Sequence, residues 1–332
     1  MKRYLRNTAL FIIALFILVT LLALATSHMV YNRGFENWES ESNLLMMKKN
    51  QEYGLLIMGI SHARNFTRHK NHLRVEKILD KKMINIGIGG GDCGTNDQHF
   101  YLKYFYSTGN KTEKVLYVLS PTIMTKGFGN KASNTFELEP LRLDFFGQYV
   151  CFKTDNKYER LFYYVKSKFS RKWFGLKPKS LEIKKSALEK LDSSKIKEGL
   201  KLLLVEGERL DEFQRNSQMV EETIRLARAN QSEIVFIIPP ALFGKWMGHF
   251  KVMDFLEAMN TKYGTRYYDF SESVLIPKYY YDHHHLNSAG IEYFTENYLK
   301  EVIDHSLNIY RDVILEEKEL PISRRLWLLY QH

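Results

Sequence analysis

The first thirty residues carry the longest apolar run of the chain. No charged residue lies between Arg6 and Arg33, and the stretch TALFIIALFILVTLLALAT covers 19 positions. At a rise of 1.5 Å per residue, 19 residues form about 28 Å of helix, enough to cross the hydrocarbon core of a bilayer. The pattern therefore predicts a transmembrane anchor within residues 1–30.

The charges that flank this run predict its orientation. Lys2, Arg3 and Arg6 precede it, while only Arg33 lies close behind it. The positive-inside rule then leaves the N-terminus in the cytoplasm and exports everything after residue 30. Two alternatives stay open: a signal peptide cut at the small residues of ALATS, and a buried helix of a soluble protein.

Beyond the anchor, short apolar runs alternate with helical patterns. Strands are predicted at residues 55–59, 83–89, 115–120, 233–240 and 266–270. Helices are predicted at about 68–80, 95–108, 209–229 and 288–303. This alternation is typical of a doubly wound, flavodoxin-like α/β fold with a parallel five-stranded sheet. In such sheets the ligand site lies beyond the carboxyl ends of the strands.

The predicted organisation has five parts. A cytoplasmic stub and anchor come first, then a linker, then an α/β domain with a basic helical insertion, then a C-terminal helical tail. The corresponding residues are 1–30, 31–51, 52–303, about 121–205 for the insertion, and 304–332.

Charge is concentrated in the insertion. The 332 residues carry a net charge of +10, and residues 151–205 hold 15 Lys and Arg against 6 Asp and Glu, interleaved with aromatics. Export disfavours nucleic acid as the partner, so we expect either contact with anionic lipid headgroups or glycans, or simply solvated helical faces. The candidate contacts are Lys166, Lys168, Arg171 and Lys172.

Cys93 and Cys151 are the two cysteines of the chain. In an oxidising compartment they could pair, and the sequence leaves this open. Two cysteines are too few for a disulfide scaffold.

The first strand runs into MGISHARNF, which places Ser61 two residues past the strand, in the first turn of a helix. A serine there is exposed and faces the positive end of the helix, which stabilises an alkoxide. The ordinary alternative is a serine that only caps the helix. Ala63 and Arg64 exclude the G-x-S-x-G elbow. Arg64 is a candidate for binding a substrate carboxylate or phosphate, or for a structural ion pair.

The second strand runs into GIGGGDCGTND, in which Gly89, Gly91 and Gly94 spell G-x-G-x-x-G. A dinucleotide site also needs an acidic residue after the next strand, whereas Glu113 precedes that strand. Since nucleotides are also scarce outside the cytoplasm, we expect no cofactor. These glycines suit a tight turn whose N–H groups point at a reacting oxygen.

Near the C-terminal end the chain reads KYYYDHHHLNSAG. Asp282 and His285 lie three residues apart, so the acid can hold the imidazole in one tautomer for general-base chemistry. Asn287 is a candidate helix cap, and Gly290 allows close packing. Zinc is the alternative, but adjacent histidines are expected to splay apart and no H-E-x-x-H spacing occurs, so we expect no metal.

These blocks together resemble the SGNH/GDSL hydrolase superfamily. More narrowly, they are similar to its membrane-anchored branch, whose members modify cell-surface polymers in alginate O-acetylation and teichoic-acid D-alanylation. The resemblance covers roughly residues 52–303 without the insertion, and D-x-x-H-L-N-x-x-G is its most specific part.

The resemblance implies a role for each site residue. Ser61 would be the nucleophile, His285 the base and Asp282 the orienting acid, with an oxyanion hole formed by the N–H groups of Ser61 and of Gly90 or Gly91. The superfamily usually adds an asparagine in G-x-N-D after strand three, where this chain has SPT. The GTND at 94–97 follows strand two, and we interpret it as a helix start. The missing donor would be worth roughly 3 kcal/mol.

The sequence thus predicts a membrane-anchored, extracytoplasmic enzyme that transfers or removes an acyl group, most simply acetyl, on a surface glycan or polymer. The alternative is a non-catalytic accessory protein that docks a membrane-bound O-acyltransferase through the basic insertion.

Overall fold

The computed structural model describes residues 1–35, 40–89, 93–125, 134–178, 210–246 and 248–304, with the single positions 188, 190, 192 and 194. The chain divides into two compact units. Unit 1 comprises residues 1–48 and 130–180, and unit 2 comprises residues 49–129 and 181–332. In the sequence, the second segment of unit 1 therefore lies between the two segments of unit 2.

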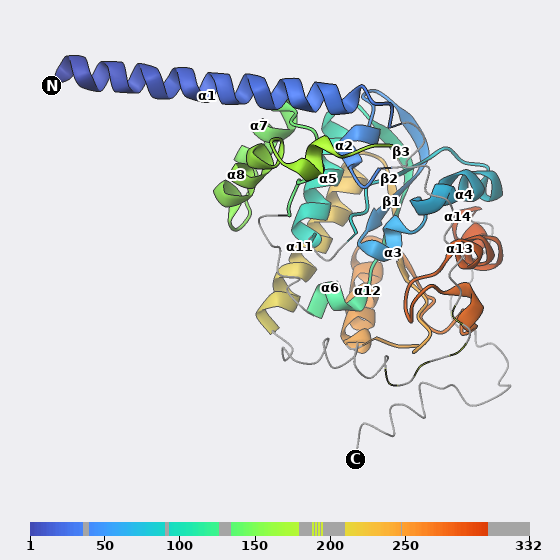
Figure 1. Cartoon of the computed structure of the whole chain (residues 1–332). Helices are drawn as coiled ribbons and strands as arrows, with labels where there is room; N and C mark the ends of the chain where they lie inside the picture. Colours follow the sequence, from blue (N-terminus) through green and yellow to red (C-terminus); the bar gives the residue numbers. More distant parts are fainter. Residues whose placement is uncertain are drawn as a thin grey trace, which may run out of the picture. The chain divides into compact units, whose positions relative to one another are not determined.

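Unit 2 is built on a five-stranded parallel sheet (Figure 1). From edge to edge its strands are β2 (Met83–Asn85), β1 (Glu52–Gly59), β3 (Lys111–Val118), β4 (Glu233–Ile238) and β5 (Arg266–Asp269). The order 2-1-3-4-5 is that of flavodoxin-like folds, with the topological switch between β1 and β3. The predicted fold class is confirmed.

Helices cover both faces of the sheet (Figure 1). One face carries α4 (Asn71–Leu79), α13 (Ser288–Phe294), the π-helical turn η3 (Thr295–Leu299) and α14 (Lys300–Asp304). The other carries α5 (Thr95–Ser107), α11 (Leu210–Ala229) and α12 (His249–Tyr263). Short connecting elements are α3 (Ser61–Arg64), η1 (Arg68–Lys70), α6 (Pro121–Thr125) and η2 (Pro277–Tyr279).

The core explains why the strands are nearly continuous apolar runs. Leu55 and Ile57 point to the face of α4 and α13, and side chains alternate along a strand, so Leu56 and Met58 point to the other face. All four are fully buried. A strand covered on both faces cannot show a polar alternation, which is what the sequence pattern indicated.

Besides shifts in the ends of β1, β3 and β4, two differences from the sequence prediction concern β2 and α12. β2 ends at Asn85 instead of residue 89, although Ile86 and Ile88 still donate backbone N–H groups to β1. Helix α12 was not predicted. Its buried Val252, Leu256 and Met259 do have helical spacing, and left-handed glycines flank it, so the signal was present in the sequence.

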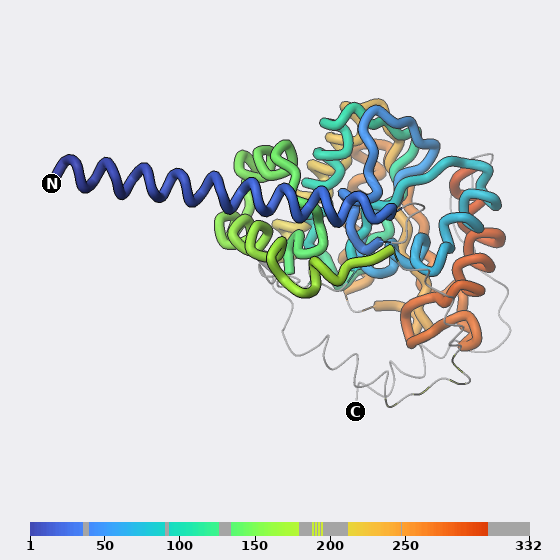
Figure 2. The backbone as a smooth tube through the Cα atoms, turned by 45° about the horizontal axis from the view of Figure 1, so that its top comes forward, coloured from blue at the N-terminus to red at the C-terminus, as the bar shows by residue number. Residues whose placement is uncertain are grey.

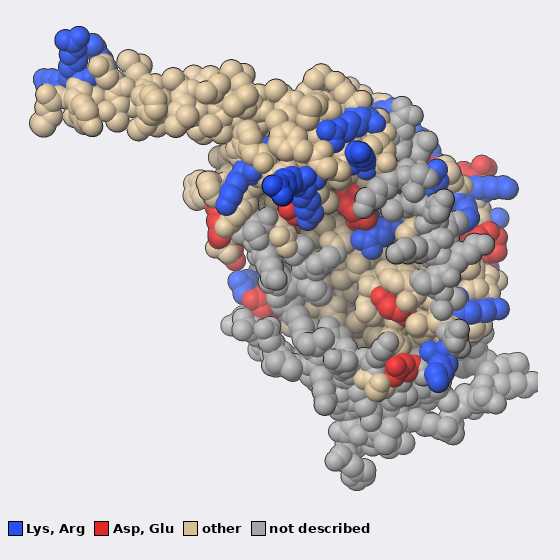
Figure 3. Space-filling view, viewed as in Figure 1, with Lys and Arg blue, Asp and Glu red and all other residues tan. Residues whose placement is uncertain are grey.

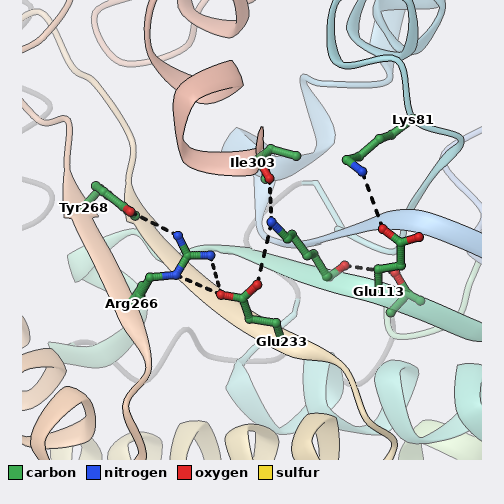
Figure 4. Close-up of polar contacts among 8 residues, drawn as sticks. Lys81, Glu113, Glu233, Arg266, Tyr268 and Ile303 are labelled. Carbon is green, nitrogen blue, oxygen red and sulfur yellow. Dashed lines mark hydrogen bonds and ion pairs between the residues drawn. The ribbon is translucent and has the colours of Figure 1, made fainter. Parts of the chain in front are cut away.

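Polar contacts near the beginnings of β3, β4 and β5 are structural (Figure 4). Glu233 pairs with Arg266, and it also lies 3.7 Å from the Lys114 ammonium. Lys114 donates to the carbonyl oxygen of Ile303 at 2.5 Å, which holds α14 against the sheet. Burial lowers the pKa of Lys114, and Glu233 opposes that shift.

Unit 1 combines the N-terminal helix with the insertion. Its helices are α1 (Lys2–Tyr31), α2 (Asn43–Met46), α7 (Leu143–Cys151), α8 (Lys157–Ser167) and α9 (Arg171–Phe174). α1 is long and apolar enough to cross a membrane. In both ribbon views α7 and α8 lie beside its second half (Figure 1, Figure 2).

The segment predicted as a linker at 31–51 is partly packed structure. Ser42 caps α2, and its hydroxyl donates to the Glu139 carboxylate at 2.5 Å. The same carboxylate accepts the backbone N–H groups of Asn43 and Leu44 at 2.9 and 2.8 Å. The compact units therefore divide near residues 48 and 130, whereas the sequence suggested 51 and 121. The predicted tail beyond residue 304 lies outside the described residues.

Lys168 corrects one expectation about the basic insertion. The side chain is fully buried, so it is not available to an anionic surface. Its ammonium donates to the carbonyl oxygen of Glu137 at 2.9 Å and lies 4.0 Å from the ring centroid of Trp173. Cys93 is buried and Cys151 is exposed.

Candidate active site

The turn after β1 brings Ser61 to the carboxyl end of the sheet. Gly59, the last strand residue, has φ +141, and a Cβ atom there would lie 2.4 Å from the carbonyl oxygen of Val118. Only glycine therefore lets β1 end this close to β3. The chain turns at once into α3, with Ser61 as its first residue, as the sequence predicted.

Ser61, His285 and Asp282 form one hydrogen-bonded chain. The Ser61 Oγ lies 2.7 Å from His285 Nε2, and His285 Nδ1 lies 2.7 Å from Asp282 Oδ2. A carboxylate can only accept, so Nδ1 carries the proton and leaves Nε2 to accept from the serine hydroxyl. This arrangement is what a hydroxyl nucleophile and its general base require.

Asp282 is held in place by the loop that follows it. Its Oδ1 accepts the backbone N–H groups of His284 and His285 at 2.9 and 2.7 Å. Burial alone would raise the pKa of Asp282, but the hydrogen bond from His285 and the neighbouring imidazoles hold it well below its usual range. The carboxylate therefore stays ionised at neutral pH and can orient the ring.

Two aromatic rings fix the plane of His285. His62 stacks on one side, with ring centroids 4.7 Å apart and planes at 24°. The Tyr281 ring is nearly parallel to the His285 ring, with ring centroids 5.4 Å apart and planes at 2°. With the His285 side chain only 12% exposed, the imidazole is pre-organised and does not need to be ordered when substrate arrives.

His62 is a site residue that the sequence did not reveal. Its Nδ1 lies 2.8 Å from the Ser120 hydroxyl, just after β3. Burial lowers the pKa of His62 well below its ordinary value, and the nearby His285 and His284 add to this shift. His62 is therefore a neutral support beside the base. The signal was weak: it is simply the residue that follows Ser61.

The three consecutive histidines play three different parts. His285 is bonded to Ser61, whereas His284 reaches Asp282 only at 3.6 Å and packs edge-on against Trp246. Burial and the nearby His285 lower the pKa of His284 to about 4. His283 accepts the N–H of Leu242 with its backbone carbonyl at 3.0 Å.

One of the sequence arguments against a metal site was wrong, namely that adjacent histidine side chains splay apart. The rings of His284 and His285 do not splay apart, since their centroids lie 4.1 Å apart. Together with His62 they offer ring nitrogens within 4.8 Å of one another. Both nitrogens of His285 are already bonded to Ser61 and Asp282, so an ion here would have to displace the serine. The expectation of no metal stays a prediction.

The loop after β2 enters the site beside Ser61. Ile88 donates its N–H to the carbonyl oxygen of Gly59 at 3.1 Å. The buried Asn85 side chain donates to the Ala63 carbonyl at 2.7 Å and accepts the Gly87 N–H at 2.8 Å, which ties this loop to α3. The predicted oxyanion donors Gly90 and Gly91 lie outside the described residues.

No asparagine follows β3, and Ser120 stands there instead with its hydroxyl bonded to His62. The literal GTND is a helix start, as interpreted from the sequence, because Gly94 is the N-cap of α5. Asp97 is buried in that helix. The segment after β3 therefore supplies no asparagine donor to an oxyanion hole.

Arg64 differs from the expectation of a substrate-binding cation. Its side chain is only 2% exposed. One guanidinium nitrogen lies 3.4 and 3.3 Å from the carbonyl oxygens of Asn85 and Gly87. These contacts favour a structural role for Arg64, in which it supports the backbone of the loop after β2. α3 is also a single turn, so the dipole contribution expected at Ser61 is small.

Two solved structures to which this chain is similar are described as acyl-hydrolysing enzymes. A proposed acylhydrolase from Bacteroides fragilis is 13% identical, covering 77% of this chain and 86% of its own, with a TM-score of 0.38. A GDSL-like lipase from Bacteroides thetaiotaomicron is 10% identical, covering 78% of this chain and 89% of its own, with a TM-score of 0.39. No family model and no curated protein matches the sequence. With global similarity this low, the argument for function comes from the site.

Proposed function

We propose that this chain is a membrane-anchored, extracytoplasmic serine esterase or acyltransferase that acts on O-acyl groups of a cell-surface glycan or polymer. The observation that carries the proposal is the hydrogen-bonded chain from Ser61 through His285 to Asp282. A lone serine or a lone Asp–His pair is common in proteins, but the three in this order at 2.7 Å have a specific chemical use.

Acylation would proceed at Ser61. As Oγ bonds to the carbonyl carbon of the ester, its proton moves to His285 Nε2, and the carbonyl oxygen becomes an oxyanion. The intermediate then breaks its bond to the leaving alcohol, which takes the proton from Nε2. Asp282 stabilises the imidazolium while it exists. The product of this half-reaction is an acyl ester on Ser61.

Deacylation decides between hydrolysis and transfer. Water or a glycan hydroxyl would give its proton to His285 Nε2 as it attacks the acyl ester, and Ser61 would regain that proton on leaving. Water would release the free acid, and a sugar hydroxyl would release an acylated glycan. An acetyl group could be removed by hydrolysis or moved by transfer in this way.

The proposed location is supported by α1 and the cations before it. A helix of 30 residues, apolar after Arg6, can anchor the chain, and Lys2, Arg3 and Arg6 favour a cytoplasmic N-terminus. The acyl substrate would then be a polymer of the cell envelope. A membrane-bound O-acyltransferase is a plausible donor partner for such a site.

A fluorophosphonate probe tests the nucleophile directly. The full-length protein in detergent should be labelled at Ser61, and Ser61→Ala should abolish labelling. Ser107→Ala is the matched control, since Ser107 is an exposed serine at the end of α5, and it should label like wild type. Absence of labelling in folded wild-type protein would favour the accessory-protein alternative over an enzyme.

A further inference from the structure

The first half of α1 is too short to cross a bilayer by itself. From residue 7 to residue 18 every side chain is exposed, and from Val19 onward one face of the helix is covered. Ala23, Ser27 and Val30 are buried. Twelve residues make about 18 Å of helix, whereas the hydrocarbon core is about 30 Å thick.

The rest of the membrane-spanning length must come from the part of α1 that packs against the remainder of unit 1. About eight more residues, 19 to 26, are needed to complete the span. At the end of that stretch Thr26 donates to the carbonyl oxygen of Lys168 at 3.3 Å, and Ser27 accepts the N–H of Leu141 at 2.8 Å. The chain around Leu141 and Lys168 therefore lies at the depth where the hydrocarbon core ends.

Helices α7 and α8, which begin and end beside these contacts, expose apolar side chains. Tyr158 and Phe162 on α8 and Phe169, two residues past its end, are exposed, with Tyr158 77% and Phe162 61% exposed. On α7, Leu143 and Val150 are exposed in the same way. Both helices also have a buried apolar face, so these outward residues are in excess of what the unit's core requires.

Cations accompany the exposed rings. The Lys157 ammonium lies 5.4 Å from the ring centroid of Tyr158, and that of Lys166 lies 5.8 Å from Phe162. Aromatic rings beside lysine and arginine are the composition of membrane–water interfaces, where the ring enters the acyl boundary and the ammonium meets the headgroups. Figure 3 shows α1 itself as an almost uncharged rod with its cations at the N-terminal end.

We propose that the outward faces of α7 and α8 form a membrane collar, a surface that sinks into the outer leaflet around the emerging α1. The collar consists of Leu143, Val150, Tyr158, Phe162 and Phe169. The occupant is the lipid bilayer, because the length of α1 places these helices at the interface. The inference rests on α1 spanning the membrane, as in the proposed function, but not on the chemistry at Ser61.

Spin labels in lipid nanodiscs test this depth. Single cysteines replace Phe162, Ile12 and Glu159 in turn in the full chain with Cys151→Ser, since Cys93 is buried. The nanodiscs contain phosphatidylethanolamine and phosphatidylglycerol. The ratio of oxygen to nickel-chelate collisions should be several-fold higher for Phe162→Cys than for Glu159→Cys, the exposed neighbour on the adjacent face of α8.

The label at Ile12→Cys separates two kinds of failure. A membrane-buried Ile12→Cys label together with a water-exposed Phe162→Cys label would contradict the membrane collar but not the anchor. The exposed rings would then be a candidate surface for a protein partner. A water-exposed Ile12→Cys label would contradict both the membrane anchor and the membrane collar. Fluorophosphonate labelling at Ser61 is independent of both results.

Discussion

Among the described residues of unit 2, two aspartate–histidine contacts are 3.0 Å or shorter, and one of these two histidines also bonds a hydroxyl group. His285 Nδ1 lies 2.7 Å from Asp282, and His249 Nε2 lies 3.0 Å from Asp269 at the end of β5. The second ring nitrogen of His285 meets Ser61, whereas that of His249 has no hydrogen-bond partner among the described residues. Pairing with a carboxylate therefore does not by itself make a histidine a base.

The two pairs also differ in what surrounds the ring. His285 contacts the rings of His62 and Tyr281, and its Nε2 bonds to Ser61 in the turn after β1. His249 is the first residue of α12, only 3% exposed, and its bond to Asp269 connects that helix to β5. We therefore expect the first pair to control rate and the second to control stability.

The largest contrast should come from removing each imidazole. His285→Ala should reduce ester hydrolysis by roughly 100- to 10,000-fold, because general-base proton transfer is lost. His249→Ala should leave the rate within about threefold of wild type, since His249 does not contact Ser61. Initial rates with p-nitrophenyl acetate measure both. Equal losses in two folded variants would contradict the distinction between the pairs.

The carboxylates should repeat this contrast. Asp282→Asn keeps an acceptor for the backbone N–H groups but can no longer hold the His285 tautomer, so the rate should fall by up to about 10,000-fold. Asp269→Asn is the matched control and should retain nearly full rate. A wild-type rate for Asp282→Asn, with circular dichroism unchanged, would show that Asp282 is dispensable for orienting the ring.

Stability should show the reverse order for His249. Its removal takes away the hydrogen bond from His249 that now lowers the pKa of Asp269. The expected loss is about 1–3 kcal/mol of unfolding free energy. Urea unfolding of His249→Ala against wild type measures it; an unchanged midpoint would mean that the pair contributes nothing.

Acid should destabilise unit 2 through His284. The folded protein lowers the pKa of His284 to about 4, whereas the unfolded chain has the ordinary value near 6.5. Between these values the unfolded state binds more protons, so stability falls as the pH drops from about 6.5 to 4. His284→Gln should flatten part of this fall in urea unfolding; an unaltered pH dependence would exclude the effect.

The sequence contained much of the site because its contacts are local or depend on fold class. Asp282 and His285 are three residues apart, and parallel strands bring Ser61 to the same end of the sheet. The contact between His62 and Ser120 joins positions 58 residues apart with no spacing rule, so periodicity could not indicate it.

Unit 1 was less accessible for the same physical reason. That residues 1–48 pack with residues 130–180 depends on tertiary contacts such as Ser42 with Glu139, across 97 positions. The burial of Lys168 was also hidden, because a lysine in a basic, aromatic stretch normally lies on the surface. Neither composition nor helical spacing separates it from its exposed neighbour Lys166.

The most direct test of the central claim is to trap the acyl ester on the protein. Wild-type protein is mixed with p-nitrophenyl acetate, quenched in acid during turnover, digested and examined by mass spectrometry. We predict one acetylated peptide, with the acetyl group on Ser61, and its loss in His285→Ala but not in His249→Ala. Turnover without any acetyl on Ser61, or with the acetyl group on another residue, would contradict a Ser61 nucleophile activated by His285.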